Sequence, residues 1–184
     1  MPHPLHSLKH EHRVIERALR AMEGMCARIA SGREVPPEAL SQLLDFISAF
    51  ADGFHHRKEE DILFPALYLQ GMAEEGGPLG VMHQQHEIGR TLIGELRQSV
   101  EALKNGSEVA GQLFIEDARR YTELLTAHIE LEDSVLFRLA DEVLEEEDKR
   151  YISDAFSQAA SELGESRVER YEQTASDLER AWAL

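Results

Sequence analysis

Cysteine is almost missing from this chain of 184 residues, in which Cys26 is the only one. A single cysteine excludes an intramolecular disulfide, and it also excludes zinc and iron–sulfur sites that need several thiolates. No apolar run approaches the ~20 residues of a membrane-spanning helix. The N-terminal stretch MPHPLHSLKHEHR lacks the hydrophobic core of a signal peptide. We therefore expect a cytoplasmic protein, kept in a reducing compartment and not associated with a membrane.

Positive charge is also scarce. The chain has 19 lysines and arginines against 35 aspartates and glutamates, a formal net charge of −16. Binding to a nucleic-acid backbone depends on clusters of Lys and Arg, so nucleic acid is not an expected partner. The acidic excess is typical of a soluble surface. The length allows one sizeable hydrophobic core and requires no second one.

The alternating pattern of β-strands is nearly absent, and helical periodicity takes its place. Breakers rich in Gly and Pro interrupt long stretches of Leu, Ala, Glu and Arg. Pro65 predicts a kink or an early end in the second long stretch, and Asn105-Gly106 predicts a left-handed stop after the third. The expected helices cover residues 5–30, 37–70, 78–104, 108–144, 148–163 and 167–182.

Short connections between long helices favour antiparallel neighbours. The predicted fold class is all-α, an up-down-up-down four-helix bundle over residues 1–144 with a short helical C-terminal extension over residues 145–184. The extension has no counterpart in the internal repeat described next. The sequence leaves open whether it packs on the bundle or mediates self-association into a homo-oligomer.

One phrase occurs twice. Residues 55–64 read H-H-R-K-E-E-D-I-L-F and residues 128–137 read H-I-E-L-E-D-S-V-L-F, so both contain His-x-x-x-Glu before an apolar end. A further histidine precedes each copy at a similar distance: His12 lies 43 residues before His55, and His86 lies 42 residues before His128. The chain therefore resembles two copies of one helical hairpin, each of which offers two His and one Glu.

These side chains occupy helix positions that the apolar pattern assigns to the core. His12, for example, interrupts a stripe of Leu5, Leu8, Ile15 and Leu19 at spacings of three, four and seven residues. Buried His and Glu cost several kcal/mol unless they are paired or bind a metal. The duplicated set predicts a metal site, and its expected ligands are His12, His55, Glu59, His86, His128 and Glu132.

The ligand set favours two iron ions. It contains nitrogen and oxygen donors only, and one zinc would use about four of the six. If Glu59 and Glu132 both bridge, each iron receives two imidazoles and two carboxylate oxygens. A bridging oxo or hydroxo group would add a fifth donor and leave about one open position per octahedral iron, where dioxygen, peroxide or nitric oxide would bind. A ferritin-like site is disfavoured because the chain has no Glu-x-x-His.

The phrases LKHEHRVIE (8–16), HHRKEEDILFP (55–65), GPLGVMHQQHEIGR (77–90) and HIELEDSVLF (128–137) are similar to those of the hemerythrin-like, HHE cation-binding family. The resemblance covers about residues 8–140, and it implies a four-helix bundle with a non-haem di-iron centre held by the same six residues. Oxygen-carrying members place a second His where this chain has Arg90, and a later Asp where it has Glu132. That departure argues against simple oxygen carriage and favours redox chemistry, sensing or iron handling.

Several neighbours are secondary candidates. His83 precedes His86 by three residues, a spacing that differs from the family's, and Tyr121 lies two turns before His128. Asp52 is a candidate to orient the second ring nitrogen of His55. Because adjacent helical residues diverge by about 100°, we expect three residues next to the ligands to lie at the rim of the site: His56, Glu60 and Asp133.

The leading functional hypothesis is a di-iron protein that senses, carries or detoxifies a small gaseous or peroxide ligand. The alternatives are a di-iron peroxidase or nitric oxide reductase, an iron store or delivery module, and a structural bundle that holds zinc. The sequence does not decide whether the protein is an enzyme, because an open metal position suits turnover and reversible binding equally.

Overall fold

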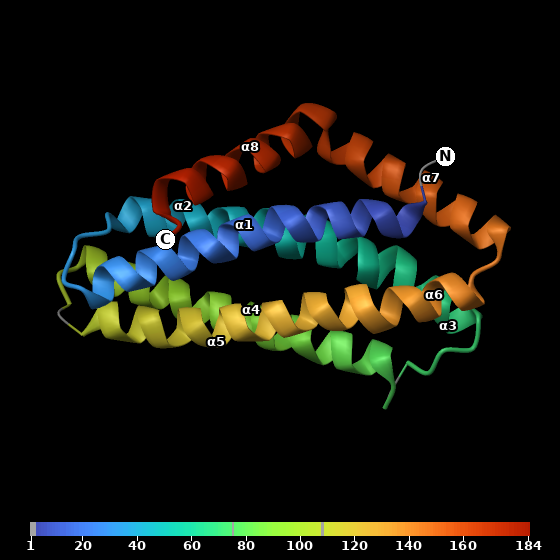
Figure 1. The fold of residues 1–184 in the computed structure, drawn as a ribbon, viewed down its shortest axis with the longest axis horizontal. Helices are drawn as coiled ribbons and strands as arrows, with labels where there is room; N and C mark the ends of the chain where they lie inside the picture. Colours follow the sequence, from blue (N-terminus) through green and yellow to red (C-terminus); the bar gives the residue numbers. More distant parts are fainter. Residues whose placement is uncertain (1–2, 75, 108) are drawn as a thin grey trace.

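Helices make up nearly all of the computed structural model, which describes residues 3–74, 76–107 and 109–184 (Figure 1). No strand occurs among these residues, so the all-α prediction is confirmed. None of the described helices combines the length and apolar character that crossing a membrane requires. The elements are α1 (Pro4–Ala30), α2 (Pro37–Phe46), η1 (Ile47–His56), η2 (Glu59–Leu63), α3 (Phe64–Leu69), α4 (Pro78–Lys104), α5 (Ala110–Leu131), η3 (Glu132–Leu136), α6 (Phe137–Val143), α7 (Glu146–Leu163) and α8 (Glu165–Trp182).

These elements form four long rods and two outer helices. The second rod runs from α2 to α3 and the fourth from α5 to α6, so the predicted helices 37–70 and 108–144 each correspond to several consecutive segments. The predicted first residue of the latter, 108, lies outside the described residues. Pro65 is the second residue of α3, directly after the π-helical segment η2, and the rod continues past it to Leu69. Gly106 ends α4 at φ 78°, which is the predicted left-handed stop.

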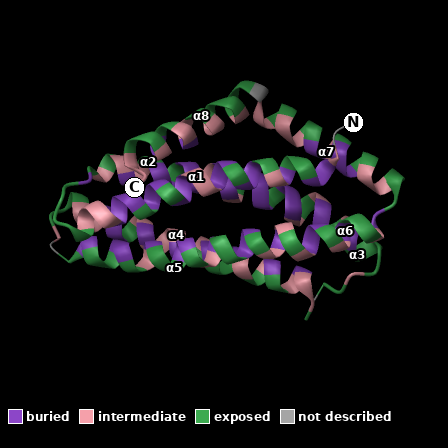
Figure 2. Cartoon of the chain, viewed as in Figure 1, coloured by how far each residue is buried: buried purple, intermediate pink, exposed green. Residues whose placement is uncertain are grey.

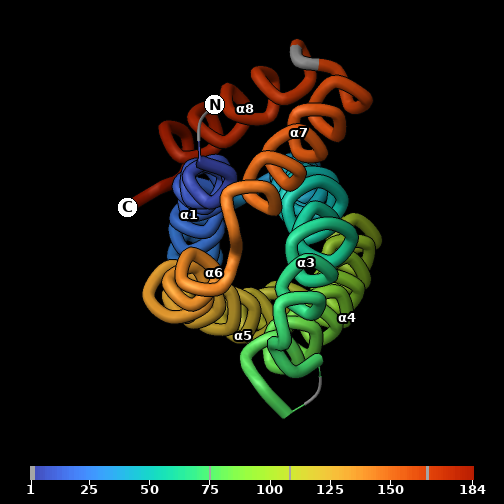
Figure 3. The backbone as a smooth tube through the Cα atoms, turned by 90° about the vertical axis from the view of Figure 1, so that its right-hand side faces the viewer, coloured from blue at the N-terminus to red at the C-terminus, as the bar shows by residue number. Residues whose placement is uncertain are grey.

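Figure 3 looks along the rods and shows α1, the α2–α3 rod, α4 and the α5–α6 rod around a common centre. The buried faces of the four rods point toward that centre (Figure 2). The apolar core divides into two clusters, one containing Leu8 and Leu63 and the other Ile15 and Phe50. His12 lies between Leu8 and Ile15 on α1, so the polar site separates the two apolar clusters.

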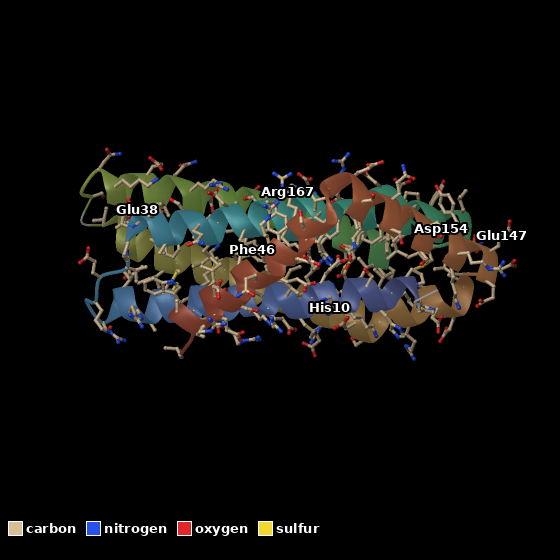
Figure 4. The ribbon with its side chains drawn as sticks, turned by 90° about the horizontal axis from the view of Figure 1, so that it is seen from above. His10, Glu38, Phe46, Glu147, Asp154 and Arg167 are labelled. Atoms are coloured by element: carbon tan, nitrogen blue, oxygen red, sulfur yellow. The ribbon has the colours of Figure 1, made fainter. Side chains whose placement is uncertain are left out.

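The C-terminal helices α7 and α8 pack outside the four rods, along α1 (Figures 1 and 4). His10 of α1 bonds Glu172 of α8 at 2.9 Å, and Arg20 donates to Glu179 at 2.7 Å. Gly24 of α1 lies against Trp182, the last residue of α8. A Cβ on Gly24 would collide with the backbone of Trp182, so glycine permits this close approach of α8 to α1. The extension therefore covers one side of the rods in this chain.

Candidate metal centre

The six predicted ligands come together at the centre of the four rods. His12 lies on α1, His55 on η1, His86 on α4 and His128 on α5, and each is at most 2% exposed. The two carboxylates of Glu59 and Glu132, which begin η2 and η3, are fully buried. Each rod thus contributes at least one imidazole, and no member of the predicted set is left outside.

The donor atoms form two groups, in each of which the ligand atoms lie within 4.8 Å of one another. One group consists of His12, His55, Glu59 and Glu132, and the other of His56, Glu59, His86 and His128. We call them the His12/His55 half and the His56/His86/His128 half. Glu59 belongs to both groups, so one carboxylate is common to the two halves.

Both carboxylates lie between the halves. Glu59 places Oε1 3.4 Å from Nε2 of His55 and Oε2 3.6 Å from Nε2 of His86. Glu132 places Oε2 3.0 Å from Nε2 of His12 and 3.4 Å from Nε2 of His128. Each carboxylate therefore contacts one imidazole from each half.

Most of the ring nitrogens and carboxylate oxygens that face the centre lack a hydrogen bond. The described residues contain eight buried side-chain N or O atoms without a hydrogen-bond partner, and all eight belong to this site. A buried polar atom left unpaired costs about 1–3 kcal/mol, so such a concentration would be a heavy penalty for a structural core. A bound cation is the partner that imidazole nitrogens and carboxylate oxygens share. Nitrogen and oxygen donors at these positions therefore fit a metal centre.

The outer ring nitrogens fix the tautomer of four imidazoles. Nδ1 of His12 lies 3.0 Å from Asp133, and Nδ1 of His86 lies 2.6 Å from Glu60. An ionised carboxylate only accepts, so Nδ1 is the protonated donor and Nε2 keeps its lone pair for the centre. Nδ1 of His128 faces Gln85 Oε1 at 2.9 Å in the same way. Nδ1 of His55 donates to Glu11 at 3.0 Å.

Two of these lone pairs face each other. Nε2 of His86 and Nε2 of His128 are 3.2 Å apart. With Nδ1 protonated on both rings, neither Nε2 has a proton to donate, and the two lone pairs repel one another unless a cation lies close to both. The pair is a further sign that the inward face is arranged for a positive ion.

The prediction that His56 lies at the rim is wrong. His56 is 5% exposed, and its ring stacks on that of His86 with centroids 3.9 Å apart. The cause is the π-helical segment η1, which ends at His56. A π-turn closes over i→i+5 instead of i→i+4, so it changes which residues share a face. Both His55 and His56 consequently reach the core, and the site gains a fifth imidazole.

Each of the three π-helical segments among the described residues overlaps the repeated phrase: η1 ends in it at His55 and His56, η2 begins at Glu59, and η3 begins at Glu132. Such wide turns are rare and occur often at functional sites. A helical periodicity of 3.6 residues therefore misplaces some of the residues in these segments, such as His56. This explains why the duplicated spacing found the site but missed one of its members.

Carboxylates outside the centre connect the imidazoles to cations. Glu60 and Asp133 have side chains 23% and 25% exposed, as expected of rim groups. Each contacts a histidine on one side and an arginine on the other. The chains are His12–Asp133–Arg13, with the arginine at 2.5 Å, and His86–Glu60–Arg90, with the arginine at 2.9 Å.

Asp52 does not orient His55, contrary to the prediction. Its Oδ1 lies 3.6 Å from Nδ1 of His56 and accepts a hydrogen bond from Nε of Arg90 at 2.8 Å. His55 is instead held by Glu11, which sequence reasoning missed. Glu11 lies three residues after Leu8 and four before Ile15, so the helical stripe that located His12 also placed Glu11 near the core.

The pKa values favour neutral imidazoles on three of the rings. Burial lowers the pKa of His55 well below its usual value and lowers that of His128 to about 4. Burial likewise lowers the pKa of His86. Burial also opposes the charging of His12, but the hydrogen bond to Asp133 and the negative charge of Glu132 raise its pKa to about 8. Neutral imidazole is the form that ligates metals.

The two carboxylates respond to their surroundings in opposite directions. Burial raises the pKa of Glu59 well above its usual value, and the negative charge of Glu132 acts in the same direction. Burial also acts to raise the pKa of Glu132, but the nearby imidazoles of His128 and His12 overcome this effect and lower it to about 2. A bound cation would keep both carboxylates ionised.

A cavity of about 290 Å³ borders the His56/His86/His128 half. Its walls come from η1, α4 and α5, and include Ile93, Leu124 and Tyr121. Burial raises the pKa of Tyr121 above its usual value, so its phenol stays protonated. Arg90 lies in the cavity wall. His83 is not part of the site: its ring packs edge-on against Phe64 at 5.1 Å and it belongs to neither donor group.

An all-helical fold with a buried cluster of His and Glu defines a helical cation-binding protein. The family profile of the hemerythrin HHE cation-binding domain matches residues 3–140. The chain therefore belongs to the hemerythrin HHE cation-binding domain family, and the resemblance seen in the sequence is confirmed.

Two relatives are similar over almost the whole chain. It is 24% identical over 182 residues to uncharacterized protein Rv1995 of Mycobacterium tuberculosis (strain ATCC 25618 / H37Rv) and to uncharacterized protein Mb2018 of Mycobacterium bovis. Each alignment covers 96% of this chain and 69% of the relative. No solved structure matches the chain significantly.

Proposed function

We propose that this protein binds two non-haem iron ions and uses them to sense or detoxify a small oxidant. His12 and His55 would hold one iron, and His56, His86 and His128 the other. Glu59 and Glu132 would be shared between them. The observation that supports this most directly is the set of eight buried, unpartnered N and O atoms, to which both halves contribute.

The number of donors supports two ions. Five imidazoles and two carboxylates exceed the four ligands that a structural zinc uses. Nitrogen and oxygen donors without thiolate suit iron in its ordinary oxidation states. The arrangement of the four rods suits an up-down-up-down bundle that places one imidazole-bearing helix on each side of the metals.

The cavity supports a small-molecule partner. It gives dioxygen, peroxide or nitric oxide access to the His56/His86/His128 half without unfolding the bundle. Bound iron would supply one-electron chemistry and a position for such a ligand. The chain's own residues would exclude bulk water through Ile93 and Leu124, and Tyr121 would present a protonated phenol to the same space.

Tyr121 favours an enzyme as the second candidate. A phenol in the wall of the cavity that borders the site could offer a proton or an electron to a bound oxidant, as a peroxidase or nitric oxide reductase requires. Iron storage or delivery is less well supported, because His12, His55, Glu59 and Glu132 are fully buried and an outgoing ion would have to pass through the packed rods. A cytoplasmic location and self-association stay predictions.

Metal content with optical spectra tests the proposal. The protein is made under iron-replete conditions, purified, and measured as isolated, after reduction and after exposure to air or peroxide. We expect two irons per chain and a charge-transfer absorption of an oxygen-bridged ferric pair, which disappears on reduction. A chain that carries only zinc, or that holds no more than one iron after anaerobic loading, would contradict it.

A turnover assay separates the two candidates. With an added electron donor, an enzyme reduces many equivalents of peroxide or nitric oxide per chain, whereas a sensor or carrier shows one spectral change. Tyr121→Phe keeps the ring and removes the phenol. If turnover occurs in the parent, this variant should lose most of it and keep both irons.

A further inference from the structure

The ammonium group of Lys58 is buried beside the metal centre. Lys58 is 3% exposed, and its Nζ contacts the carboxylate of Glu11. Two aromatic rings enclose the same ammonium: Nζ lies 4.6 Å from the ring centroid of Phe54 and 4.7 Å from that of Phe156. A buried ammonium is stable only with such partners. Phe156 belongs to α7, so the C-terminal extension supplies one of the two rings.

Glu11 contacts both Lys58 and His55, so the position of the Lys58 ammonium affects the orientation of the His55 ring. Its Oε1 accepts hydrogen bonds from Lys58 and, at 3.1 Å, from the hydroxyl of Ser7. Its Oε2 accepts the Nδ1 proton of His55 at 3.0 Å. With both oxygens occupied, the carboxylate has one orientation, and that orientation directs Nε2 of His55 toward Glu59.

The other two carboxylate–cation pairs next to the site are more exposed to solvent. Asp133 pairs with Arg13, whose side chain is 51% exposed, and Glu60 pairs with Arg90, whose side chain is 34% exposed. Solvent screens the charge of an exposed arginine, whereas a buried ammonium acts almost unscreened. Among these three cations, Lys58 therefore has the strongest effect per contact, and it alone is covered by α7.

We propose that Lys58 and Phe156 are positioning residues of the metal centre, and that α7 is thereby part of that centre. Phe156 keeps the Lys58 ammonium against Glu11, and Glu11 keeps His55 in the Nδ1-protonated form with Nε2 free to bind metal. Without the ring, the ammonium moves toward water, Glu11 loses its counter-charge, and the hydrogen bond to His55 changes. The inference rests on the proposed iron centre and adds a residue of the extension to it.

Substitutions that keep the shape of the site test this network. Phe156→Leu removes the ring and Phe156→Tyr keeps it. Lys58→Met removes the charge, and because it leaves Glu11 buried without a cation, the double variant Lys58→Met/Glu11→Gln removes both charges at similar volume. The controls are Tyr151→Leu on α7, where Tyr151 is 67% exposed, and Arg57→Met, where the side chain is 76% exposed.

Iron affinity is the first measurement, by anaerobic titration against a chelator, with the optical spectrum recorded at each step. We expect Lys58→Met, the double variant and Phe156→Leu to bind one of the two irons about 10–100-fold more weakly and to shift the charge-transfer band. Phe156→Tyr, Tyr151→Leu and Arg57→Met should match the parent. Parent-like affinity and spectrum in Phe156→Leu and in the double variant would overturn the inference.

The second measurement does not need iron. In the metal-free chain, labelled with 15N at histidine, the Nδ1 proton of His55 should give a slowly exchanging NMR signal that Phe156→Leu shifts and Phe156→Tyr does not. If the chain binds no iron but this pattern appears, the proposed function fails and the network stands. If the chain binds two irons but Phe156→Leu leaves both the His55 signal and the iron affinity unchanged, the network is wrong and the iron centre stands.

Discussion

The His12/His55 half of the centre is sealed inside the bundle, whereas the His56/His86/His128 half borders a cavity of about 290 Å³. The sealed half has two imidazoles and the other half has three. The outer partner of His55 is fixed by a buried lysine, while that of His86 is fixed by the partly exposed Arg90. A duplicated sequence thus produces two unequal sites, because one copy of the repeat carries an extra histidine on a π-helical turn.

Removing the charge of Glu59, one of the two carboxylates that contact both halves, should have the largest effect. Glu59→Gln keeps the volume but removes the negative charge that both halves use, and we expect both irons to bind more than about 100-fold more weakly. The metal-free variant should be at least as stable as the parent, because the substitution removes a buried acid with no hydrogen bond. Iron titration and thermal unfolding measure the two effects. The control is Glu87→Gln, whose side chain is 73% exposed.

Single imidazoles should separate the halves. His56→Leu should weaken the iron of the three-histidine half and leave the other bound, and His12→Leu should do the reverse. The stoichiometry would fall from two irons to one in each variant, with different remaining spectra. If His56→Leu retains both irons with the parent's spectrum, His56 is a packed core histidine and the ligand set shrinks to the six residues predicted from the sequence.

Filling the cavity should affect access and not metal binding. A Cβ on Gly94 would meet no heavy atom within 4 Å, and Gly94 lines the cavity. We expect Gly94→Leu to slow the binding of azide to the oxidised protein and to leave two irons in place. Gly94→Ala is the matched control: both variants should gain about 1 kcal/mol of stability from helix propensity, but alanine should leave the azide rate unchanged. Equal rates in both would place the access route elsewhere.

Arg90 should give the smallest effect. It donates to Asp52 and Glu60, which contact His56 and His86, so Arg90→Met weakens two outer contacts of the cavity half. Such partly exposed pairs contribute about 0.2–1 kcal/mol each. We expect a few-fold loss of iron affinity in that half, largest at low salt, by chelator titration. A loss as large as that of Glu59→Gln would mean that Arg90 contacts the bound ligand directly.

The helices could be predicted well from the sequence because Gly, Pro and Asn-Gly mark their ends. Gly106 ends its helix in the predicted left-handed conformation, whereas the rod that contains Pro65 continues to Leu69. The six predicted metal residues could be placed because their spacing obeys helical periodicity, and the structure brings all of them together. Whether each one ligates stays a prediction.

What the sequence did not reveal depends on departures from that periodicity and on contacts between rods. Regular α-helical spacing predicts His56 at the rim because it separates neighbouring residues widely, and the π-helical turn of η1 removes that separation. The same spacing predicts that Asp52, one turn away, contacts His55, but Glu11 on another rod accepts the hydrogen bond from Nδ1 of His55. The partners Lys58 and Phe156 are far apart in sequence and carry no shared motif.

Mössbauer spectroscopy of the protein loaded with 57Fe tests the central claim, that the chain holds two irons in unequal surroundings. We predict two irons per chain and, in the reduced protein, two distinct quadrupole doublets of equal area, one of which is lost in His56→Leu. A single doublet at one iron per chain would contradict the account.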